Sequence, residues 1–214
     1  MTIQGTGGAA ATSVAIPTHA AGDLIWVITR AASNTAPTKP TASGTVPNWT
    51  VAYTGGANTL AFVSAWFVAT ASTTTTGAWT GASHIAVIVL RPIPGMLLGV
   101  NAAPTGTANG SNSQTIDYPS CAPVTTINGS SSGLRMATRG TAATSMNTPP
   151  TGWTNQLVQP SGAGALIAVH TFAPLTQNIG LLTVSLTGTT NAPWRAHSFE
   201  ITEKPPQQRM MVIT

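Results

Sequence analysis

Residues 22–30 read GDLIWVITR, and this run decides the fold. It is rich in β-branched and aromatic residues and follows a Gly-Asp turn, which predicts a buried strand. A Pro-rich turn then leads to the Trp49-Thr50 pair, a second apolar run covers residues 60–68, and the run HIAVIVLR closes the series at residues 84–91. The residues between the last two runs are rich in Thr and predict one more strand.

The same series of cues occurs a second time later in the chain. It starts with GLRMATRG at residues 133–140, passes through a Pro-rich turn to Trp153-Thr154, and ends with WRAHSFEI at residues 194–201. Residues 166–172 align without a gap on the first seven residues of the earlier apolar run. Because a repeat constrains the architecture before any single residue does, we expect two halves of one design.

The strand pattern predicts an all-β fold. No stretch combines helical apolar spacing with caps and a charged face, whereas short apolar runs between turns are typical of sandwiches and barrels. Since four or five strands do not bury both faces alone, we expect one antiparallel double-sheet sandwich, jelly-roll-like, built from two sequence-related halves. Its expected parts are an N-terminal arm (1–12), a single sandwich (13–201) with half A (13–93), a connector (94–114) and half B (115–201), and a C-terminal arm (202–214).

Side-chain alternation predicts the faces of individual strands. Both faces of residues 60–68 are apolar, which indicates an interior strand. Trp49, Val51 and Tyr53 alternate with smaller or polar residues and are expected on one face. The Thr-rich segment at residues 73–79 is expected to form a strand of the first half.

Charge and cysteine content exclude several classes of protein. The 214 residues include only 8 Lys and Arg and 4 Asp and Glu, and the basic residues form no cluster, so we expect no nucleic-acid binding. The single cysteine, Cys121, rules out an intramolecular disulfide and is expected to be a small buried hydrophobe. No apolar run is long enough to cross a bilayer and no signal peptide is recognisable, so we expect no membrane insertion.

The few ionisable side chains do not form a recognisable catalytic or metal-binding motif. Asp23 follows a turn glycine and is expected to bind local backbone N–H groups. No spacing pairs two of the four carboxylates, and the four histidines match no metal-ligand motif. His84 and His197 both belong to closing strands, so a shared metal site is the one alternative. We therefore expect no enzyme activity and no cofactor.

Four tryptophans and Tyr53 fall into two groups. Trp49 and Trp153 occupy the same place in each half, which favours a packing role beneath the Pro-rich turn. Trp79, Trp194 and Tyr53 are the candidates for an exposed aromatic platform that stacks on sugars.

The run at residues 22–25, the Trp49-Thr50 pair, AWFVATA at residues 65–71 and HIAVIVLR at residues 84–91 together resemble a β-sandwich module of tailed-bacteriophage virion proteins. The resemblance covers residues 17–93 and fits the second half more loosely, through PTGWT at residues 150–154. It implies a minor tail, fibre or head-decoration protein and carries no catalytic residues.

The C-terminal segment has a composition of its own. Residues 203–209 are polar and Pro-rich, and an apolar tip follows them. An apolar tip is costly to leave in water, so it either folds back on its own domain or adds to a neighbouring subunit as a strand. The expected partner-binding residues are Met210, Met211, Val212 and Ile213.

These observations lead to a ranked set of functional hypotheses. The first is a non-enzymatic virion protein of the outer particle, in a tail tip or fibre, that contacts the host surface. The alternatives are a capsid decoration protein and a carbohydrate-binding module. The expected partners are other virion proteins, further copies of the chain (a trimer is one candidate) and a host surface glycan. The expected location is the virion, after synthesis in the cytoplasm of the bacterial host.

Overall fold

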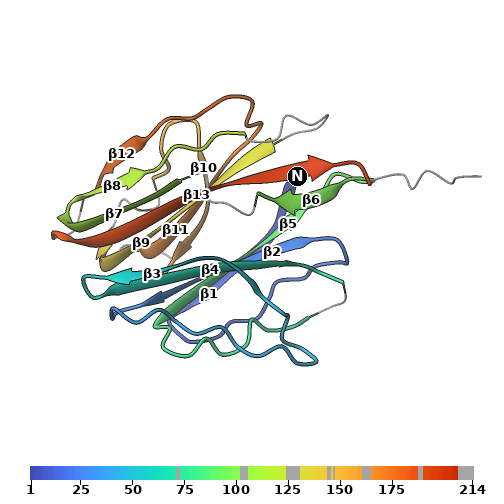
Figure 1. The fold of residues 1–214 in the computed structure, drawn as a ribbon, viewed down its shortest axis with the longest axis horizontal. Coiled ribbons are helices and arrows are strands. Elements are labelled where there is room, and N and C mark those ends of the chain that lie inside the picture. Colours follow the sequence, from blue (N-terminus) through green and yellow to red (C-terminus); the bar gives the residue numbers. More distant parts are fainter. Residues whose placement is uncertain are drawn as a thin grey trace, which may run out of the picture.

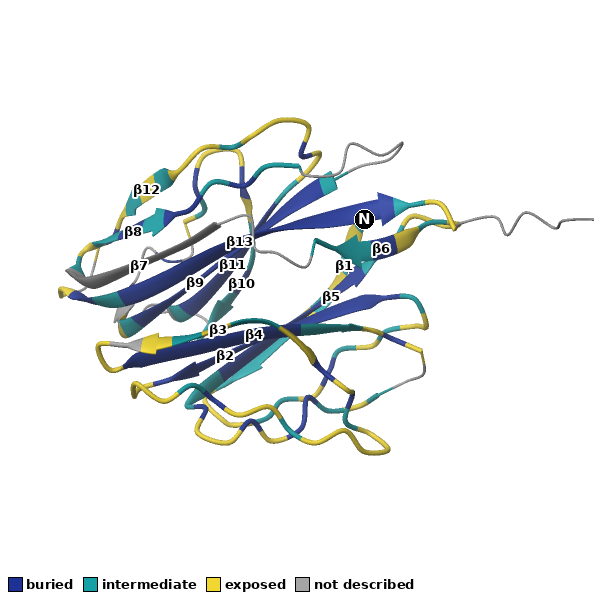
Figure 2. Cartoon of the chain, viewed as in Figure 1, coloured by how far each residue is buried: buried dark blue, intermediate teal, exposed yellow. Residues whose placement is uncertain are grey.

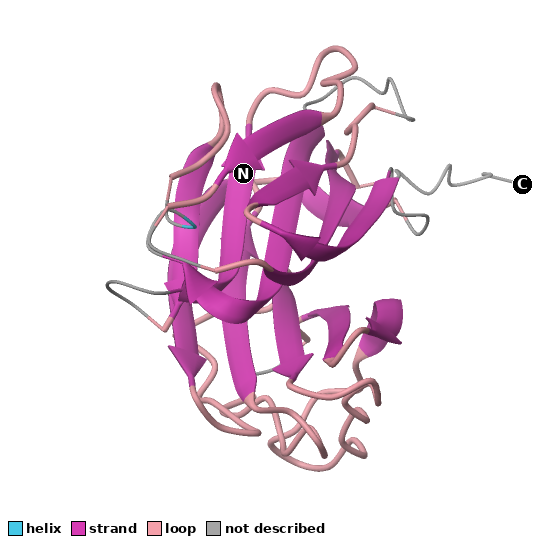
Figure 3. Ribbon diagram, turned by 90° about the vertical axis from the view of Figure 1, so that its left-hand side faces the viewer, coloured by secondary structure: helices cyan, strands magenta, loops and turns pink. Residues whose placement is uncertain are grey.

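The computed structural model describes residues 1–70, 73–101, 106–123, 131–143, 146, 148–160, 165–187 and 190–206. Within these residues the chain is all-β and its strands pair antiparallel, as expected (Figure 3). Two large sheets and one two-stranded ribbon contain the strands of the described residues.

The first sheet contains five strands and uses only the first part of the chain. Its spatial order is β1-β5-β2-β4-β3. The strands are β1 (Thr2–Ala9), β2 (Leu24–Ala31), β3 (Thr50–Ala57), β4 (Leu60–Val68) and β5 (His84–Arg91). β2 and β4 are interior strands with apolar residues on both faces, which confirms the expectation for residues 60–68.

The second sheet uses the remainder of the chain, in the order β10-β11-β9-β13-β6, with β7 also paired to β13. Its strands are β6 (Leu97–Val100), β7 (Gly106–Ser113), β9 (Ser131–Ala143), β10 (Thr154–Gln159), β11 (Ala165–Phe172) and β13 (Ala192–Lys204). A ribbon of β8 (Thr115–Tyr118) and β12 (Leu182–Ser185) lies on this sheet (Figure 1).

The two sheets have the same topology, which supports the repeat seen in the sequence. In the first sheet β5, β2, β4 and β3 are neighbours in that order, and in the second sheet β13, β9, β11 and β10 follow the same order. β6 and β7 pair with β13 in the place that β1 takes beside β5. Each half of the chain therefore supplies one complete sheet.

A shared irregularity fixes which residues correspond. The register of β3 shifts between Val51 and Tyr53, and that of β10 shifts between Asn155 and Leu157. Such a bulge turns the following side chains to the other face. Trp49 and Tyr53 therefore pack into different clusters while Val51 is exposed, so the prediction that these three side chains share a face is wrong.

The same registers correct the alignment of β4 with β11. The gapless alignment equates Phe62 with Ala168, but Phe62 packs between the two sheets whereas Ala168 lies under the ribbon. Ile167 is the structural equivalent of Phe62, since both lie in the cluster between the sheets. The alignment is off by one residue, and a shift of one residue exchanges the two faces of a strand.

One hydrophobic cluster joins the two sheets. It combines Leu24, Trp26 and Ile28 of β2 with residues of β9, β11 and β13, and Trp26 lies 4.7 Å from Phe199 between ring centroids. The buried strands face each other in Figure 2. Full burial of each large apolar side chain contributes about 1.5–3 kcal/mol relative to exposure, so this cluster supplies the main attraction between the halves.

Two buried arginines connect the sheets at their margins. Arg30 of β2 donates from Nε to the carbonyl of Arg139 at 2.7 Å and from Nη2 to the carbonyl of Gly140 at 2.8 Å. In the opposite direction, Arg195 of β13 donates to the carbonyl of Leu60 at 3.2 Å. Burial lowers the pKa of Arg30 from its usual value. These arginines hold the sheets together through backbone acceptors.

Three expected segments differ from the structure. Residues 2–9, expected as part of an arm, form β1 because they pair with the apolar edge of β5. Residues 94–114, expected as a connector, contain β6 and β7, which extend the second sheet beside β13. Residues 73–79 form no strand; Thr75 makes one isolated bridge with Ala15.

The start of the expected C-terminal arm is also corrected. β13 continues through Lys204, so residues 202–204 belong to the sheet and are paired with β6. Only residues 205 and 206 of the remaining segment are described. The predicted partner-binding residues Met210, Met211, Val212 and Ile213 lie outside the described residues.

Candidate functional site

The tryptophans proposed as a sugar platform are buried. Trp79 is fully buried and Trp194 is 3% exposed, while Tyr53 is half-buried and packs its ring against His197, tilted by 41° with 3.5 Å between ring centroids. They therefore form no exposed platform, and that expectation is wrong for these residues. Trp49 and Trp153 are also buried, which confirms the packing role predicted from their recurrence.

Each recurring tryptophan lies on the outer face of its own sheet. Trp49 donates from Nε1 to the carbonyl of Thr76 at 3.0 Å, which fixes the covering loop of the first sheet. Trp153 packs with Cys121 and Leu175 and accepts the guanidinium of Arg135 over its ring at 4.3 Å. Trp49 and Trp153 thus hold different covering segments against equivalent positions of the two sheets. Cys121 is buried, as predicted.

A cluster of buried polar side chains lies beneath the β8–β12 ribbon, around Arg135. Its Nε donates to the hydroxyl of Ser198 at 3.2 Å, and its Nη2 donates to the carbonyls of Pro119 at 2.7 Å and Gly180 at 2.9 Å. Burial lowers the pKa of Arg135 to about 10, so the side chain stays charged at neutral pH. Its charge is compensated by backbone carbonyls, which tie the loops around the ribbon to β9.

The neighbouring groups of this cluster are equally enclosed. The hydroxyl of Tyr118 lies 3.1 Å from Nε2 of His170. Burial, together with the charge of Arg135, lowers the pKa of His170 to about 3, so the imidazole is neutral at neutral pH. The hydroxyl of Ser198 donates to the carbonyl of Pro119 at 2.8 Å. A serine nucleophile needs a base to take its proton, whereas this proton is bonded to a carbonyl oxygen.

The histidines proposed for a shared metal site lie in different sheets. His84 lies in β5 of the first sheet, opposite Arg30, and His197 lies in β13 of the second sheet, opposite Met136. Burial, with Arg195 nearby, lowers the pKa of His197 to about 3. Among the described residues no group of three His, Cys, Asp or Glu side chains is placed to hold a metal ion.

The carboxylates occupy four separate positions. Asp117 accepts a hydrogen bond from Thr183 at 2.6 Å, and Glu200 accepts one from Ser131 at 2.6 Å. Glu203 accepts the backbone N–H of Ile93 at 2.5 Å, which ties the loop after β5 to the end of β13. No two of the four carboxylates face each other in these contacts.

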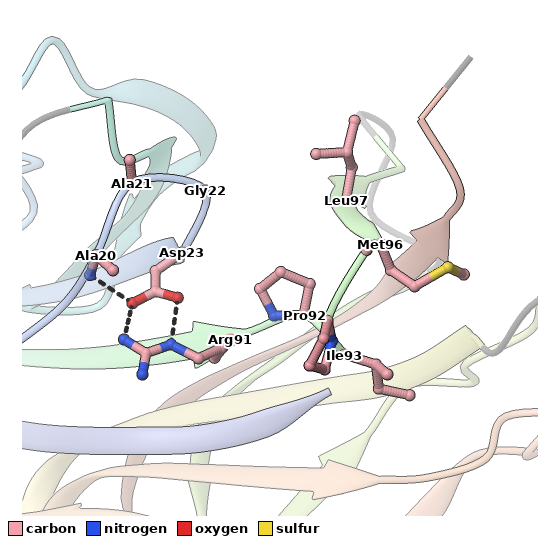
Figure 4. Close-up of a pocket in the computed structure, with 11 residues that line it drawn as sticks. Ala20, Ala21, Gly22, Asp23, Arg91, Pro92, Ile93, Met96 and Leu97 are labelled. Atoms are coloured by element: carbon pink, nitrogen blue, oxygen red, sulfur yellow. Dashed lines mark hydrogen bonds and ion pairs between the residues drawn. The ribbon is translucent and has the colours of Figure 1, made fainter. Parts of the chain in front are cut away.

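Asp23 forms one wall of a surface hollow of about 310 Å³ (Figure 4). It accepts the N–H of Ala20 at 2.7 Å, as predicted, and also two bonds from Arg91, at 2.8 Å from Nε and 2.6 Å from Nη2. Burial raises the pKa of Asp23, but the hydrogen bonds from Arg91 and Ala20 outweigh it and leave the pKa below its usual value. The pair fixes this wall of the hollow.

The opposite wall of the hollow is apolar. Pro92, Ile93, Met96 and Leu97 line it, across from Ala20–Asp23 in Figure 4. Ile93 is 51% exposed and Leu97 is 50% exposed, which makes them two of the five large hydrophobic side chains exposed among the described residues. Grouped exposed apolar residues are typical of an interaction site. This hollow is therefore the candidate partner-binding site.

The hollow lies where the C-terminal segment leaves the sheet. Leu97, at the start of β6, is the cross-strand partner of Lys204, the last residue of β13. Sequence reasoning placed residues 94–97 in the connector and the hollow's other residues in half A, and so did not bring the two walls together. The sequence feature that could have indicated the hollow is the pair of apolar residues Ile93 and Leu97 on either side of Pro94-Gly95, because a turn brings such residues together.

Comparison with known proteins found no match: no family model, no curated protein sequence and no solved structure resembles the chain closely enough to be reported. The described residues also contain no helix long and apolar enough to cross a membrane. Inferences about function therefore depend on the sequence and on the contacts described above.

Proposed function

We propose that this chain is a non-enzymatic structural protein of a tailed-bacteriophage virion. Its place is on the outer particle, in a tail tip or fibre, where it contacts other virion proteins and the host surface. The sequence resemblance in the first half motivates the class of protein. The observation that carries the proposal is the apolar hollow at the base of the C-terminal segment, since it groups two of the five exposed large hydrophobic side chains of the described residues at one site.

The buried polar groups support a structural role. Arg30 and Arg195 connect the two sheets, and Arg135 connects the ribbon loops to β9. In an enzyme, perturbed ionisable groups would gather in an accessible cleft. Here His170 and His197 are enclosed in the interior, where His170 contacts the hydroxyl of Tyr118 and His197 packs against the ring of Tyr53.

The proposal includes a double-sheet sandwich as the architecture. The shared cluster between the two sheets supports it, and each half supplies one sheet. A jelly roll distributes the strands of two Greek keys over both sheets, whereas β1–β5 and β6–β13 stay separate in the two large sheets and the ribbon. We therefore favour a duplicated sandwich over the jelly-roll arrangement.

We favour a tail component over the two alternatives. A decoration protein that clamps head subunits with two arms is less well supported, because residues 2–9 belong to the first sheet as β1. A carbohydrate-binding module is less well supported because Trp79 and Trp194 are buried.

Counting copies in purified particles tests the proposal. Quantitative mass spectrometry of phage virions whose genome encodes this chain should find it in a small, fixed number of copies, far below the number of major capsid subunits. A copy number close to that of the capsid subunits would favour the decoration protein. Absence of the chain from intact particles would contradict a virion role.

A further inference from the structure

The geometry of β13 determines where the C-terminal segment passes its own hollow. β13 and β6 are antiparallel, so Lys204, the last residue of β13, pairs with Leu97, the first residue of β6. The next two residues, Pro205 and Pro206, therefore leave the sheet beside the turn that precedes β6. Proline lacks a backbone N–H and favours extended backbone, so these residues continue outward and do not extend the pairing with β6.

The apolar tip begins well beyond that point. Met210 follows Lys204 by six residues, which span up to about 20 Å when extended. The hollow's own Leu97 is an immediate cross-strand neighbour of Lys204, at roughly 5 Å between Cα atoms. To enter its own hollow, the tip would have to reverse direction within residues 207–209. That stretch reads QQR and has none of the Gly, Asn, Asp or Pro residues that favour a tight turn.

We propose that residues 210–213 of one copy bind the hollow between Ala20–Asp23 and Pro92–Leu97 of a second copy. The inference rests on the proposed function, because that function places several copies of the chain in one particle. It deepens the proposed function by naming the site through which these copies join. Met210, Met211, Val212 and Ile213 supply the apolar side chains, and Ile93, Met96 and Leu97 form the wall that receives them.

The two surfaces match in size and chemistry. A hollow of about 310 Å³ is at the lower end of the range for sites that accept small ligands, and it suits a few side chains of an extended segment. Two methionines on the tip can adapt to an irregular apolar wall because their side chains are flexible. The Asp23–Arg91 pair closes the polar side, so no uncompensated carboxylate faces the incoming side chains.

Mixing two defective variants tests the exchange. The first lacks residues 207–214 and keeps the hollow; the second carries Ile93→Ser and Leu97→Ser and keeps the tip. By sedimentation equilibrium, the full chain should form assemblies of at least twice its mass of 21.7 kDa, and each variant alone should stay monomeric. An equimolar mixture of the two should form a heterodimer, because it restores one donor and one acceptor.

A matched surface variant and a peptide complete the design. Leu181→Ser removes another exposed apolar side chain, 60% exposed and not among the residues lining the hollow, and should associate like the full chain. A peptide of residues 204–214 should bind the tail-deleted protein. Its affinity for tail-deleted protein that also carries the two serine substitutions should be at least about tenfold lower. This difference corresponds to about 1.4 kcal/mol or more of binding free energy. Circular dichroism confirms that each variant is folded.

A monomeric full chain at all concentrations, or a mixture that stays monomeric while the full chain associates, would overturn the inference. Equal peptide binding with and without the serine substitutions would overturn it too. These measurements use purified protein and no virions. They can therefore fail while the copy count still supports a virion role, and they can succeed if the chain proves to be absent from particles.

Discussion

The outer faces of the two sheets differ more than their shared topology suggests. Immediately before the bulge, one row of cross-strand neighbours crosses each sheet. In the first sheet the row consists of Val51, Ala65, Val27 and Val87. In the second sheet the equivalent row consists of Asn155, His170, Arg135 and Ser198. The same framework therefore carries an apolar row in one half and a polar row in the other.

The covering segments account for this difference. The first sheet is covered by loops that contribute Ile16, Trp49 and Trp79 to an apolar cluster over Val27 and its neighbours. The second sheet is covered by the β8–β12 ribbon and its flanking loops, whose backbone carbonyls accept the hydrogen bonds of Arg135. A buried polar side chain is tolerated where its hydrogen bonds are made. The cover thus determines which side chains the sheet can carry.

The comparison also separates scaffold from candidate function. Features present in both halves, such as Trp49 and Trp153 or the two bulges, serve packing and register. The apolar hollow depends on the loop between β5 and β6, which joins the halves and occurs once. A surface that the repeat does not require is the better candidate for contacts with partners.

Placing a charge in the apolar row should have the largest effect. Val27→Arg would bury a cation among apolar side chains, and we expect it to lower the free energy of unfolding by roughly 5 kcal/mol, since an uncompensated buried charge costs this much. Val51→Arg, in the same row but exposed, is the control and should change stability by less than about 0.5 kcal/mol. Urea denaturation measures both. A similarly small loss of stability in both variants would show that the apolar row is accessible to water.

Removing the recurring tryptophans should have a large and similar effect in both halves. Trp49→Ala and Trp153→Ala should each lower the free energy of unfolding by about 3–5 kcal/mol, because each empties a buried site. The same denaturation experiment compares them. If only one of the two variants is less stable than the unmodified protein, Trp49 and Trp153 do not occupy equivalent positions in the two halves.

Removing the buried cation should have a somewhat smaller effect. Arg135→Met fills much of the volume but leaves the carbonyls of Pro119 and Gly180 without their donor, and we expect a loss of about 3 kcal/mol. Thermal unfolding followed by circular dichroism measures it. Lys39→Met, an exposed cation of the first half that also donates to a backbone carbonyl, serves as the comparison and should be milder. An unchanged stability for Arg135→Met would contradict the role given to the carbonyl contacts.

Acid should destabilise the protein through its buried histidines. In the fold the pKa of His170 and that of His197 are about 3, below the usual value of 6.5. The unfolded chain therefore takes up protons that the fold does not, and stability is lost as pH falls from about 6.5 toward 3. The slope is roughly 1 kcal/mol per pH unit for each histidine.

Substitution of both histidines checks this prediction. His170→Gln with His197→Gln should flatten the dependence of unfolding free energy on pH in this range, whatever the change in stability at neutral pH. Met136→Leu, next to His197 across the strands, is the control and should keep the slope of the unmodified protein. An unaltered slope in the double variant would mean that other groups cause the acid dependence.

Several elements could be predicted because their signal is local. The runs that became β2, β4 and β5 carry β-branched and apolar residues, and the recurrence of Trp49 and Trp153 predicted their burial. β1 was missed because its Gly, Thr and Ala residues have little strand signal of their own; the pairing is supplied by the edge of β5. There a Cβ at Gly5 would lie 2.8 Å from Pro17, so glycine permits close packing of the covering loop.

The hollow and the polar cluster around Arg135 both depend on contacts that no local pattern shows. The partner of Asp23 is Arg91, far along the chain, and the acceptors of Arg135 are backbone carbonyls of two separate loops. The bulges were missed for a similar reason, because they are read from the pairing of β3 with β4 and of β10 with β11. The register of the strands, to the nearest residue, could therefore be determined only from the structure.

The central claim is that both halves form equivalent, fully folded sheets, and amide hydrogen exchange followed by mass spectrometry tests it most directly. Peptides from the interior strands β2 and β4 and from their equivalents β9 and β11 should show protection that reaches the free energy of global unfolding in both halves. The edge strands β3 and β10 should exchange faster, again alike. Strong protection of β2 and β4 together with rapid exchange of β9 and β11 would contradict the account.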